Sequence, residues 1–464
     1  MPEPPHQSQI RNPQSAIRNG VLPRRLGLLQ ASALNMSNMV GAGPFITIPL
    51  MLETMHGPQA MIGWFVGLLI AACDGLVWSE LSVAMPSSGG TYLYLKQAFD
   101  PWRFGRFMAF LFVFQYLFSG PAEIATGAIG FGMYLNYLYA GSPLFAKLVP
   151  PVVCLVSTAL LYRRIESIGR LAVVMWGGML LTISTIIVLG LWHFEPSKLV
   201  FPPGAFRADR AFFTGLGAAM LIAMYDYLGY YDVCYVAEEV KEPRRVLPAS
   251  ILISVIAVAA IYFLMNVSLI TVVPWQEAIR SSARQYIASE FMARVAGRTA
   301  AVAVTVMILW TALASVFALM LGASRILYAA ARDGFFFHAF ARLHPTGEFP
   351  YLALLTLGAI SAVASLFQLD EAINGLIVVR VAVQFVGQII ALFFLHHVRR
   401  DVPLPFRMWL YPLPALVALF GWLYIFCTAQ LVYILLTGAV VVAGTVAYLV
   451  WSWKIQGWPF AAAS

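Results

Sequence analysis

The chain has 464 residues, of which 61% are hydrophobic and 11% are charged, and its formal net charge is +8. Soluble domains are about 45–50% apolar and about 25% charged, so this composition excludes a soluble globular protein. The basic residues do not cluster, which argues against nucleic acid as a partner. The four cysteines lie within or beside apolar runs and form no CxxC pair, which argues against a disulfide framework or a metal site. We predict an all-α integral membrane protein without a cofactor.

Segment 1–25 is polar and proline-rich, and we expect it to be a disordered cytoplasmic tail. No short apolar segment with a small-residue cleavage site precedes the first apolar run, so a removable signal peptide is not expected. A bilayer core needs about 20 apolar residues per helix. Runs of this kind predict twelve transmembrane helices, near 26–50, 60–84, 107–139, 147–162, 168–192, 212–235, 246–272, 299–329, 350–368, 373–397, 408–430 and 432–455.

Charge between these spans predicts the orientation. Most of the 29 lysine and arginine residues fall on the side that holds the N-terminus when the spans alternate. The positive-inside rule then predicts a multi-pass protein of the plasma or inner cell membrane with both termini in the cytoplasm. The external segment 274–298 is an exception because it carries four arginines, and we expect a surface helix there.

Two spans contain helix-breaking residues at mid-depth. The first has Gly41-Ala42-Gly43-Pro44, in which proline removes a backbone donor and the glycines permit irregular geometry. The sixth has a polar stretch, 225–232, that contains Gly229. Interruptions at corresponding places in the two halves of a chain point to a transporter's midplane binding site. Free N–H groups at one half-helix would hold a carboxylate, and free carbonyl groups at the other would hold an ammonium.

Several motifs in order resemble the amino acid–polyamine–organocation (APC) superfamily from about residue 26 to 450. The motif after span 6 closely resembles that of L-type amino acid transporters. Asp74 and Glu123 resemble acidic positions in plant polyamine-uptake permeases. The family usually has a proline where this chain has Phe337. The motifs are Gly41–Phe45, Glu80–Pro86 with Gly89–Tyr92, Ala237–Pro243 with Pro248, Ser324-Arg325 and Ala331–Gly334.

The resemblance implies a LeuT-type 5+5 inverted repeat with broken helices 1 and 6. Residues 26–397 would form the ten-helix transport core, and 398–464 would form two accessory helices and a short C-terminal tail. A small amine or amino acid would bind between spans 1, 3, 6 and 8. Backbone donors would come from Gly41, Ala42 and Gly43, the aromatic side of the pocket from Tyr225, Tyr227 and Tyr230, and the break in span 6 from Gly229.

Five charged residues lie inside the predicted spans, where an unpaired charge costs several kcal/mol. We assign Glu123 and Asp226 to substrate binding, and Glu123 and Asp74 to proton coupling. Arg380 is expected to neutralise one of these acids. The fifth is Asp232, which we expect to pair with arginines at the inner mouth, Arg244 and Arg245; Glu80, near the end of its span, is expected to pair with a loop arginine.

Coupling remains open between proton symport, which the buried acids favour, and exchange. Span 5 has no lysine that could replace a sodium ion, as some relatives have. A sodium site would need neighbouring hydroxyls on span 8, and Thr311 and Ser315 are four residues apart on one helical face. Bound proton or sodium and the lipid bilayer are thus the expected partners besides substrate, and the oligomeric state is left open.

We interpret the chain as a secondary active transporter that moves amino acids by alternating access, and not as an enzyme. The main alternative is a polyamine permease for putrescine or spermidine. More remote alternatives are a nutrient sensor with a transporter fold and a membrane acyltransferase. The last rests on the spacing of His396 and Asp401, without an accompanying oxyanion motif. No Walker-type loop for ATP is present.

Overall fold

A computed structural model describes residues 24, 26–86, 90–162, 168–280, 283–345, 349–399 and 401–460. The tail predicted for 1–25 lies outside these residues except for Arg24. Within them every regular element is a helix, and one isolated bridge joins Leu26 to Val240. The prediction of an all-α protein is therefore confirmed for this part of the chain.

The longer helices of the first half, in chain order, are α2 (Leu28–Met39), α3 (Gly43–Thr54), α4 (Ile62–Ala84), α5 (Thr91–Phe99), α6 (Gly105–Leu138), α7 (Pro143–Leu161), α8 (Ile168–Trp192) and α9 (Arg210–Tyr227). Those of the second half are α10 (Pro243–Ile270), α11 (Trp275–Arg280), α12 (Ala283–Arg332), α13 (Tyr351–Ala364), α14 (Leu369–Arg380), α15 (Gly387–His397), α16 (Leu413–Thr428) and α17 (Leu431–Lys454). Short 3₁₀ helices are η1 (Pro58–Met61), η2 (Asp100–Trp102), η4 (Pro196–Lys198), η5 (Asp232–Glu239) and η6 (His338–Ala341), and a π-helical turn is η7 (Val381–Val386).

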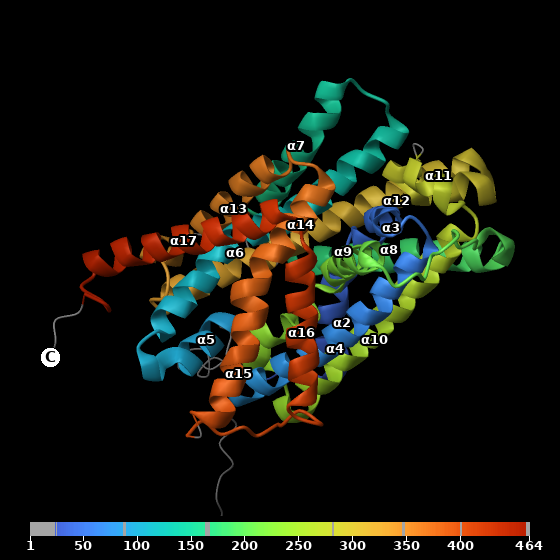
Figure 1. Ribbon diagram of the computed structural model, residues 1–464. Coiled ribbons are helices and arrows are strands. Elements are labelled where there is room, and N and C mark those ends of the chain that lie inside the picture. Colours follow the sequence, from blue (N-terminus) through green and yellow to red (C-terminus); the bar gives the residue numbers. More distant parts are fainter. Residues whose placement is uncertain are drawn as a thin grey trace, which may run out of the picture.

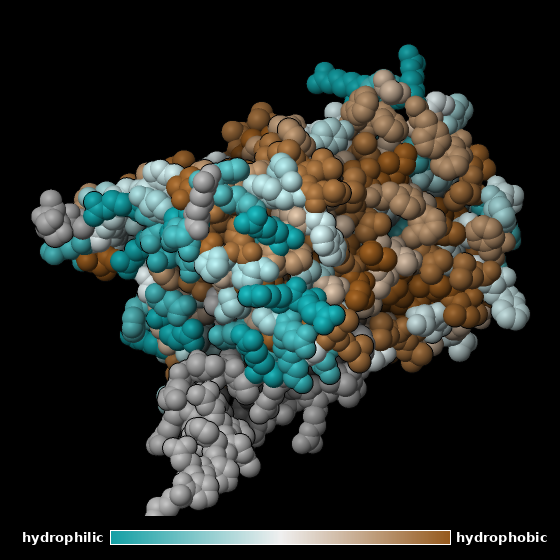
Figure 2. Space-filling view, turned by 90° about the horizontal axis from the view of Figure 1, so that it is seen from below, coloured by the Kyte–Doolittle hydropathy of each residue, from teal (hydrophilic) through white to brown (hydrophobic). Residues whose placement is uncertain are grey.

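Among the described residues, eight helical segments are long and apolar enough to cross a membrane. Three shorter apolar helices, Gly177–Trp192, Tyr351–Ala364 and Leu413–Thr428, coincide with other predicted spans. Large apolar side chains such as Trp192, Leu410 and Trp453 are exposed on the surface. Viewed from below, the molecule has a broad hydrophobic surface beside a hydrophilic region (Figure 2). A lipid-facing exterior explains this distribution, because water would disfavour it.

The first predicted span is interrupted where its glycines and proline lie. Helix α2 ends at Met39 and α3 begins at Gly43, with Pro44 in the first turn of α3. Proline is tolerated there because the first turn of a helix has no intrahelical partner for its N–H groups. The predicted interruption is confirmed, and it leaves the N–H groups of α3 pointing towards the middle of the bundle.

The sixth predicted span is interrupted as well. Helix α9 ends at Tyr227 and η5 begins at Asp232, and Gly229 between them has φ +102°. A side chain disfavours that conformation. A Cβ atom on Gly229 would also lie 2.9 Å from Cβ of Asn38, so glycine is required where the two interrupted segments cross.

Helix α12 extends beyond the eighth predicted span, 299–329, at both ends. Its geometry is non-helical at Tyr286 and at Gly297, where φ is +81°. Residues 287–296 therefore form a separate helical piece, which together with α11 supplies the surface helix expected within 274–298. The remainder of α12 packs along α6, and both helices lie in the middle of the bundle (Figure 1).

The tenth predicted span, 373–397, is not one regular helix. It consists of α14, the π-turn η7 and α15. Helix α14 packs on α6, and α15 packs on the short helix α5, which the sequence did not predict. Helices α16 and α17 lie outside this group, where α16 packs on α4 and α17 lies across α6 and α14 (Figure 1).

Candidate functional site

The two interrupted segments touch where their helices end. A Cβ atom on Gly43 would lie 2.1 Å from Oδ1 of Asp226, so the carboxylate is seated directly on the backbone of α3. The Tyr262 hydroxyl of α10 lies 2.5 Å from the carbonyl oxygen of Met39 and 3.0 Å from that of Asp226. The Tyr262 hydroxyl thus lies within hydrogen-bond distance of a carbonyl group at the end of α2 and of another at the end of α9. Carbonyl groups at the end of a helix have no partner within that helix.

A small cavity lies at this crossing. Its volume is about 20 Å³, which is room for about one water molecule. Its walls come from α2 and α3, α6, α9 and α12, the segments of predicted spans 1, 3, 6 and 8. The lining residues are Asn38, Met39, Gly41, Ala42, Gly43, Glu123, Tyr225, Asp226, Leu228, Ser315 and Leu319.

Seven of the residues proposed from the sequence line this cavity together: Gly41, Ala42, Gly43, Glu123, Tyr225, Asp226 and Ser315. Ser315 lies close to the first interruption, because a Cβ atom on Gly41 would be 2.6 Å from its Oγ. Tyr225 reaches across to α6, where its hydroxyl lies 2.7 Å from Oγ1 of Thr126. The structure therefore brings the two interruptions, both pocket acids and one span 8 hydroxyl to one place.

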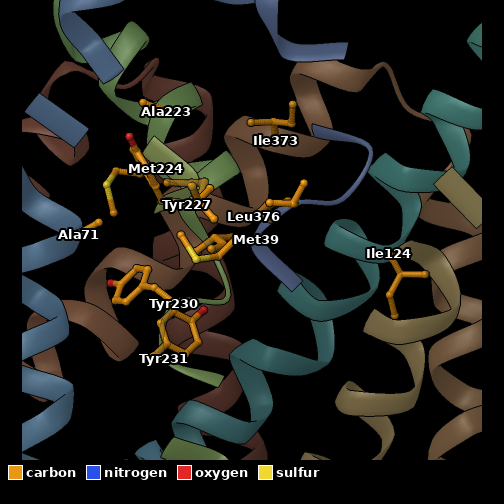
Figure 3. Close-up of a cluster of buried hydrophobic side chains, with 14 of the residues drawn as sticks. Met39, Ala71, Ile124, Ala223, Met224, Tyr227, Tyr230, Tyr231, Ile373 and Leu376 are labelled. Carbon is orange, nitrogen blue, oxygen red and sulfur yellow. The ribbon is translucent and has the colours of Figure 1, made fainter. Parts of the chain in front are cut away.

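Two of the three proposed tyrosines point elsewhere. Tyr227 donates to the carbonyl oxygen of Trp64 at 3.3 Å and packs edge-on against its ring. Tyr230 donates to Oδ2 of Asp74 at 2.5 Å. These rings gather with Met39 and Tyr231 in a buried cluster around the crossing (Figure 3). They support the crossing from outside the cavity.

Asp74 and Thr311 also lie off the cavity. Asp74 is fully buried on α4 and accepts bonds from the Trp78 indole at 3.0 Å and from Tyr230, so it ties α4 to the break in span 6. Thr311 donates to the carbonyl oxygen of Met307 and lies 3.5 Å from the Thr182 hydroxyl on α8. Thr311 is thus one helical turn from Ser315 but faces α8.

Glu123 forms an ion pair with Arg380. Their closest atoms are 2.5 Å apart, and the side chain of Arg380 is 1% exposed. The guanidinium also donates to the Ser119 hydroxyl at 3.1 Å and lies 5.3 Å from the centre of the Tyr116 ring. The expectation that Arg380 neutralises an intramembrane acid is confirmed for Glu123.

Asp226 has no such partner among the described residues. It is 2% exposed, and its Oδ2 accepts from the Thr47 hydroxyl at 2.5 Å. Its Oδ1 has no hydrogen-bond donor among the described residues. No ion pair joins Asp226 to any lysine, arginine or histidine that the structure describes. The cavity therefore has one compensated carboxylate and one uncompensated carboxylate.

Asn38 is a cavity residue that the sequence analysis missed. It lies one turn before the first interruption, and its amide donates to Oδ2 of Asp232. Asp232 was expected to pair with Arg244 and Arg245, and this expectation is wrong because its carboxylate faces inward to α2. A polar side chain within the apolar run 26–50 was the available signal.

Glu80 has different partners from the loop arginine that was expected. It is fully buried, and its carboxylate contacts Nε2 of His396 at 2.6 Å and accepts from the backbone N–H of Met408 at 2.9 Å. The expected arginine pair is wrong, because the carboxylate pairs with His396 at the end of α15 and no arginine of the described residues forms an ion pair with it. His396 also stacks on Tyr411.

These contacts remove the basis of the acyltransferase alternative. His396 is held by Glu80, and Asp401 instead accepts from Arg399 at 2.8 Å. The hydrogen bond from Arg399 holds the pKa of Asp401 below its usual range. The histidine and aspartate with suitable spacing therefore do not form the pair that base catalysis needs.

Comparison with known proteins agrees with the geometry. Residues 26–456 match the amino acid permease family. An uncharacterized transporter of Mycobacterium tuberculosis is 30% identical over 74% of this chain and 73% of its own length. Mouse Asc-type amino acid transporter 1 is 28% identical (74% and 65%), and the human cystine/glutamate transporter is 27% identical (89% and 80%). These proteins are transporters and not enzymes.

Proposed function

Since the chain belongs to the amino acid permease family, we propose that it is a secondary active transporter that moves amino acids across the cell membrane by alternating access. The observation that carries this proposal is the cavity at the crossing of two interrupted helices, at mid-depth in an apolar bundle. The cavity has room for about one water molecule, so a substrate would enter only after the half-helices move. Movement of the half-helices would open it to one face at a time.

The proposed architecture has twelve spans, with spans 1–5 and 6–10 as two units of opposite topology and the last two as accessory helices. Corresponding spans of the two units pack on each other: span 1 on span 6 through α3 and α9, and, for the next three spans, α4 on α10, α6 on α12, and α7 on α13. A two-fold relation between the units would produce such pairs. Residues 26–397 would then be the transport core.

Substrate would be recognised first by its α-carboxylate. The N-terminus of α3 presents backbone N–H groups around Gly43, at the positive end of the helix dipole. Ala42 in the interruption would add a further donor beside them, whereas the N–H of Gly41 donates to the carbonyl oxygen of Met39 at 3.0 Å. The amino acid transporters among the relatives share this need to hold a carboxylate.

For energy coupling we propose proton symport through Glu123, with exchange as the second possibility. Protonation of Glu123 would remove the charge that Arg380 balances at the edge of the cavity, so the same event would alter both the ion pair and the site. A sodium ion at Ser315 and the interruption near Gly41 is less well supported, because Thr311 faces α8.

Uptake of labelled amino acids into proteoliposomes tests this function. We expect saturable accumulation that an inward proton gradient increases and that a protonophore collapses. Glu123→Gln should remove the dependence on pH. Accumulation that needs an internal amino acid but no gradient would indicate exchange. Saturable binding without accumulation would contradict transport and favour the sensor alternative.

A further inference from the structure

The charge balance of the cavity indicates which substrates it accepts, provided that the proposed transport function is correct. The described residues that line it include two acids, Glu123 and Asp226, and no lysine, arginine or histidine. Arg380 balances Glu123 from behind the cavity wall. Among the residues that the structure describes, no lysine, arginine or histidine forms an ion pair with Asp226.

An uncompensated buried carboxylate is costly within a membrane. A neutral amino acid brings one ammonium and one carboxylate, which compensate each other, so the filled site would still hold the unbalanced charge of Asp226. A substrate with a second cationic group would balance it. The charge count therefore favours a cationic substrate over a neutral one.

The geometry leaves one oxygen of Asp226 available for such a group. The Thr47 hydroxyl holds Oδ2 and fixes the carboxylate, while Oδ1 is buried and has no donor in the part of the chain that the structure describes. Asp226 lines the cavity. The glycine at position 43 permits this placement, because a Cβ atom would occupy the space of Oδ1. Unpaired buried polar atoms are rare in folded proteins, so this oxygen points to a ligand.

The other residues that line the cavity suit the stem of a basic side chain once the half-helices have moved apart, because the cavity as it stands has room for about one water molecule. Met39, Leu228 and Leu319 provide apolar walls, and the Tyr225 ring lies beside them. Methylene groups would pack on the apolar side chains, and an aromatic face attracts a cation.

We propose that Asp226 binds the cationic group of the substrate through Oδ1, so that this permease prefers amino acids with an amine or guanidinium side chain to neutral ones. The second basic centre binds at Asp226, beside the N-terminus of α3. Asp226 is thus the residue that determines charge specificity.

Competition binding on the full-length protein in lipid nanodiscs tests this assignment, with tritiated lysine as the probe. Ornithine and arginine should displace lysine at lower concentrations than leucine or alanine do. Asp226→Asn should weaken lysine binding by about ten- to hundredfold, the range of a hydrogen bond to a charged group. Alanine binding should weaken far less. Glu80→Gln is the matched control, because it removes a fully buried carboxylate that does not line the cavity and should not change the ratio of lysine to alanine affinity.

Other outcomes separate this inference from the proposed function. Stronger binding of neutral than of cationic amino acids by the unaltered protein would overturn the assignment of Asp226 without any variant. An Asp226→Asn protein that weakens both classes equally and loses the pH dependence of uptake would overturn it too, since Asp226 would then carry a proton. Displacement by putrescine and by no amino acid would contradict amino acid transport but support the cation site.

Discussion

Gly43 is the residue on which the candidate site depends most directly. It begins α3, it lines the cavity, and its missing side chain makes room for the carboxylate of Asp226. The backbone of Gly43 and the carboxylate of Asp226 are therefore in direct contact, and a substitution at either position would displace the other residue.

Gly43→Ala tests this match. Its Cβ atom would have to displace the Asp226 carboxylate, and overpacking of this kind costs about 1–3 kcal/mol. We expect substrate affinity to fall by about tenfold or more. Gly322→Ala on α12 is the control, because a Cβ atom there meets nothing within 4 Å. Equal uptake by both variants would contradict the close contact.

The ion pair between Glu123 and Arg380 is the second residue-scale feature with a measurable effect. Arg380→Gln leaves Glu123 without its cation in a largely buried position, and breaking a buried pair costs about 3–5 kcal/mol. The melting temperature of the purified protein should fall accordingly. The double variant Glu123→Gln, Arg380→Gln should recover most of the loss, because neither residue then carries an unpaired charge. A double variant no more stable than Arg380→Gln alone would argue against the pairing.

Individual residues also show how far the sequence could predict the site. The glycines, Glu123 and Asp226 were identified because breaks and charges are unusual in apolar runs. The grouping of Tyr225 with Tyr227 ignored helix geometry, since residues two apart in an α-helix point to nearly opposite sides. The partners of Glu123, Glu80 and Asp232 required the three-dimensional packing, because they are distant in the chain.

At the scale of elements, the half-helix α2 and the segment η5 are joined into one unit. Leu26 and the residues around Val240 exchange two backbone hydrogen bonds, of 3.0 and 2.9 Å. The side chain of Asn35 accepts from the N–H of Val233 at 2.9 Å. Helix α2 and η5 are therefore joined by hydrogen bonds to the backbone on one side of the cavity.

Asn35→Ala should destabilise this unit. The N–H of Val233 would be buried without an acceptor, at a cost of about 1–3 kcal/mol. The expected result is a lower melting temperature and faster hydrogen exchange in residues 232–239. Asn374→Ala, which removes a side-chain bond to the backbone of its own helix α14, should have a smaller effect. Unchanged exchange in η5 would show that Asn35 does not hold it.

Most elements were predictable because about 20 apolar residues specify a membrane helix whatever surrounds them. Both interruptions were predictable from glycine and proline. The helix α5 and the π-turn were not, because neither has a distinctive composition and both depend on packing between α15 and its neighbours.

For the whole molecule, the distribution of charge predicts its direction in the membrane. A green fluorescent protein fused after residue 464 should fluoresce in a bacterial host, since the C-terminus is expected in the cytoplasm. Alkaline phosphatase fused at the same place should be inactive, whereas the enzyme inserted in the external loop at 203–205 should be active. Phosphatase activity at the C-terminus would reverse the proposed orientation.

The π-turn η7 sets the rotational phase between two distant contacts of one span. A π-turn is an α-helix with one inserted residue, and each residue rotates a helix by about 100°. Before the turn, Arg380 faces Glu123; after it, Gln388 accepts from Thr91 and His396 contacts Glu80. If residues 381–386 formed a regular α-helix, only one of the two sets of contacts could form, because the side chains at the other end of the span would point in a different direction. Deletion of one residue there would therefore uncouple the cavity from the far end of the span, although every contacting side chain was kept.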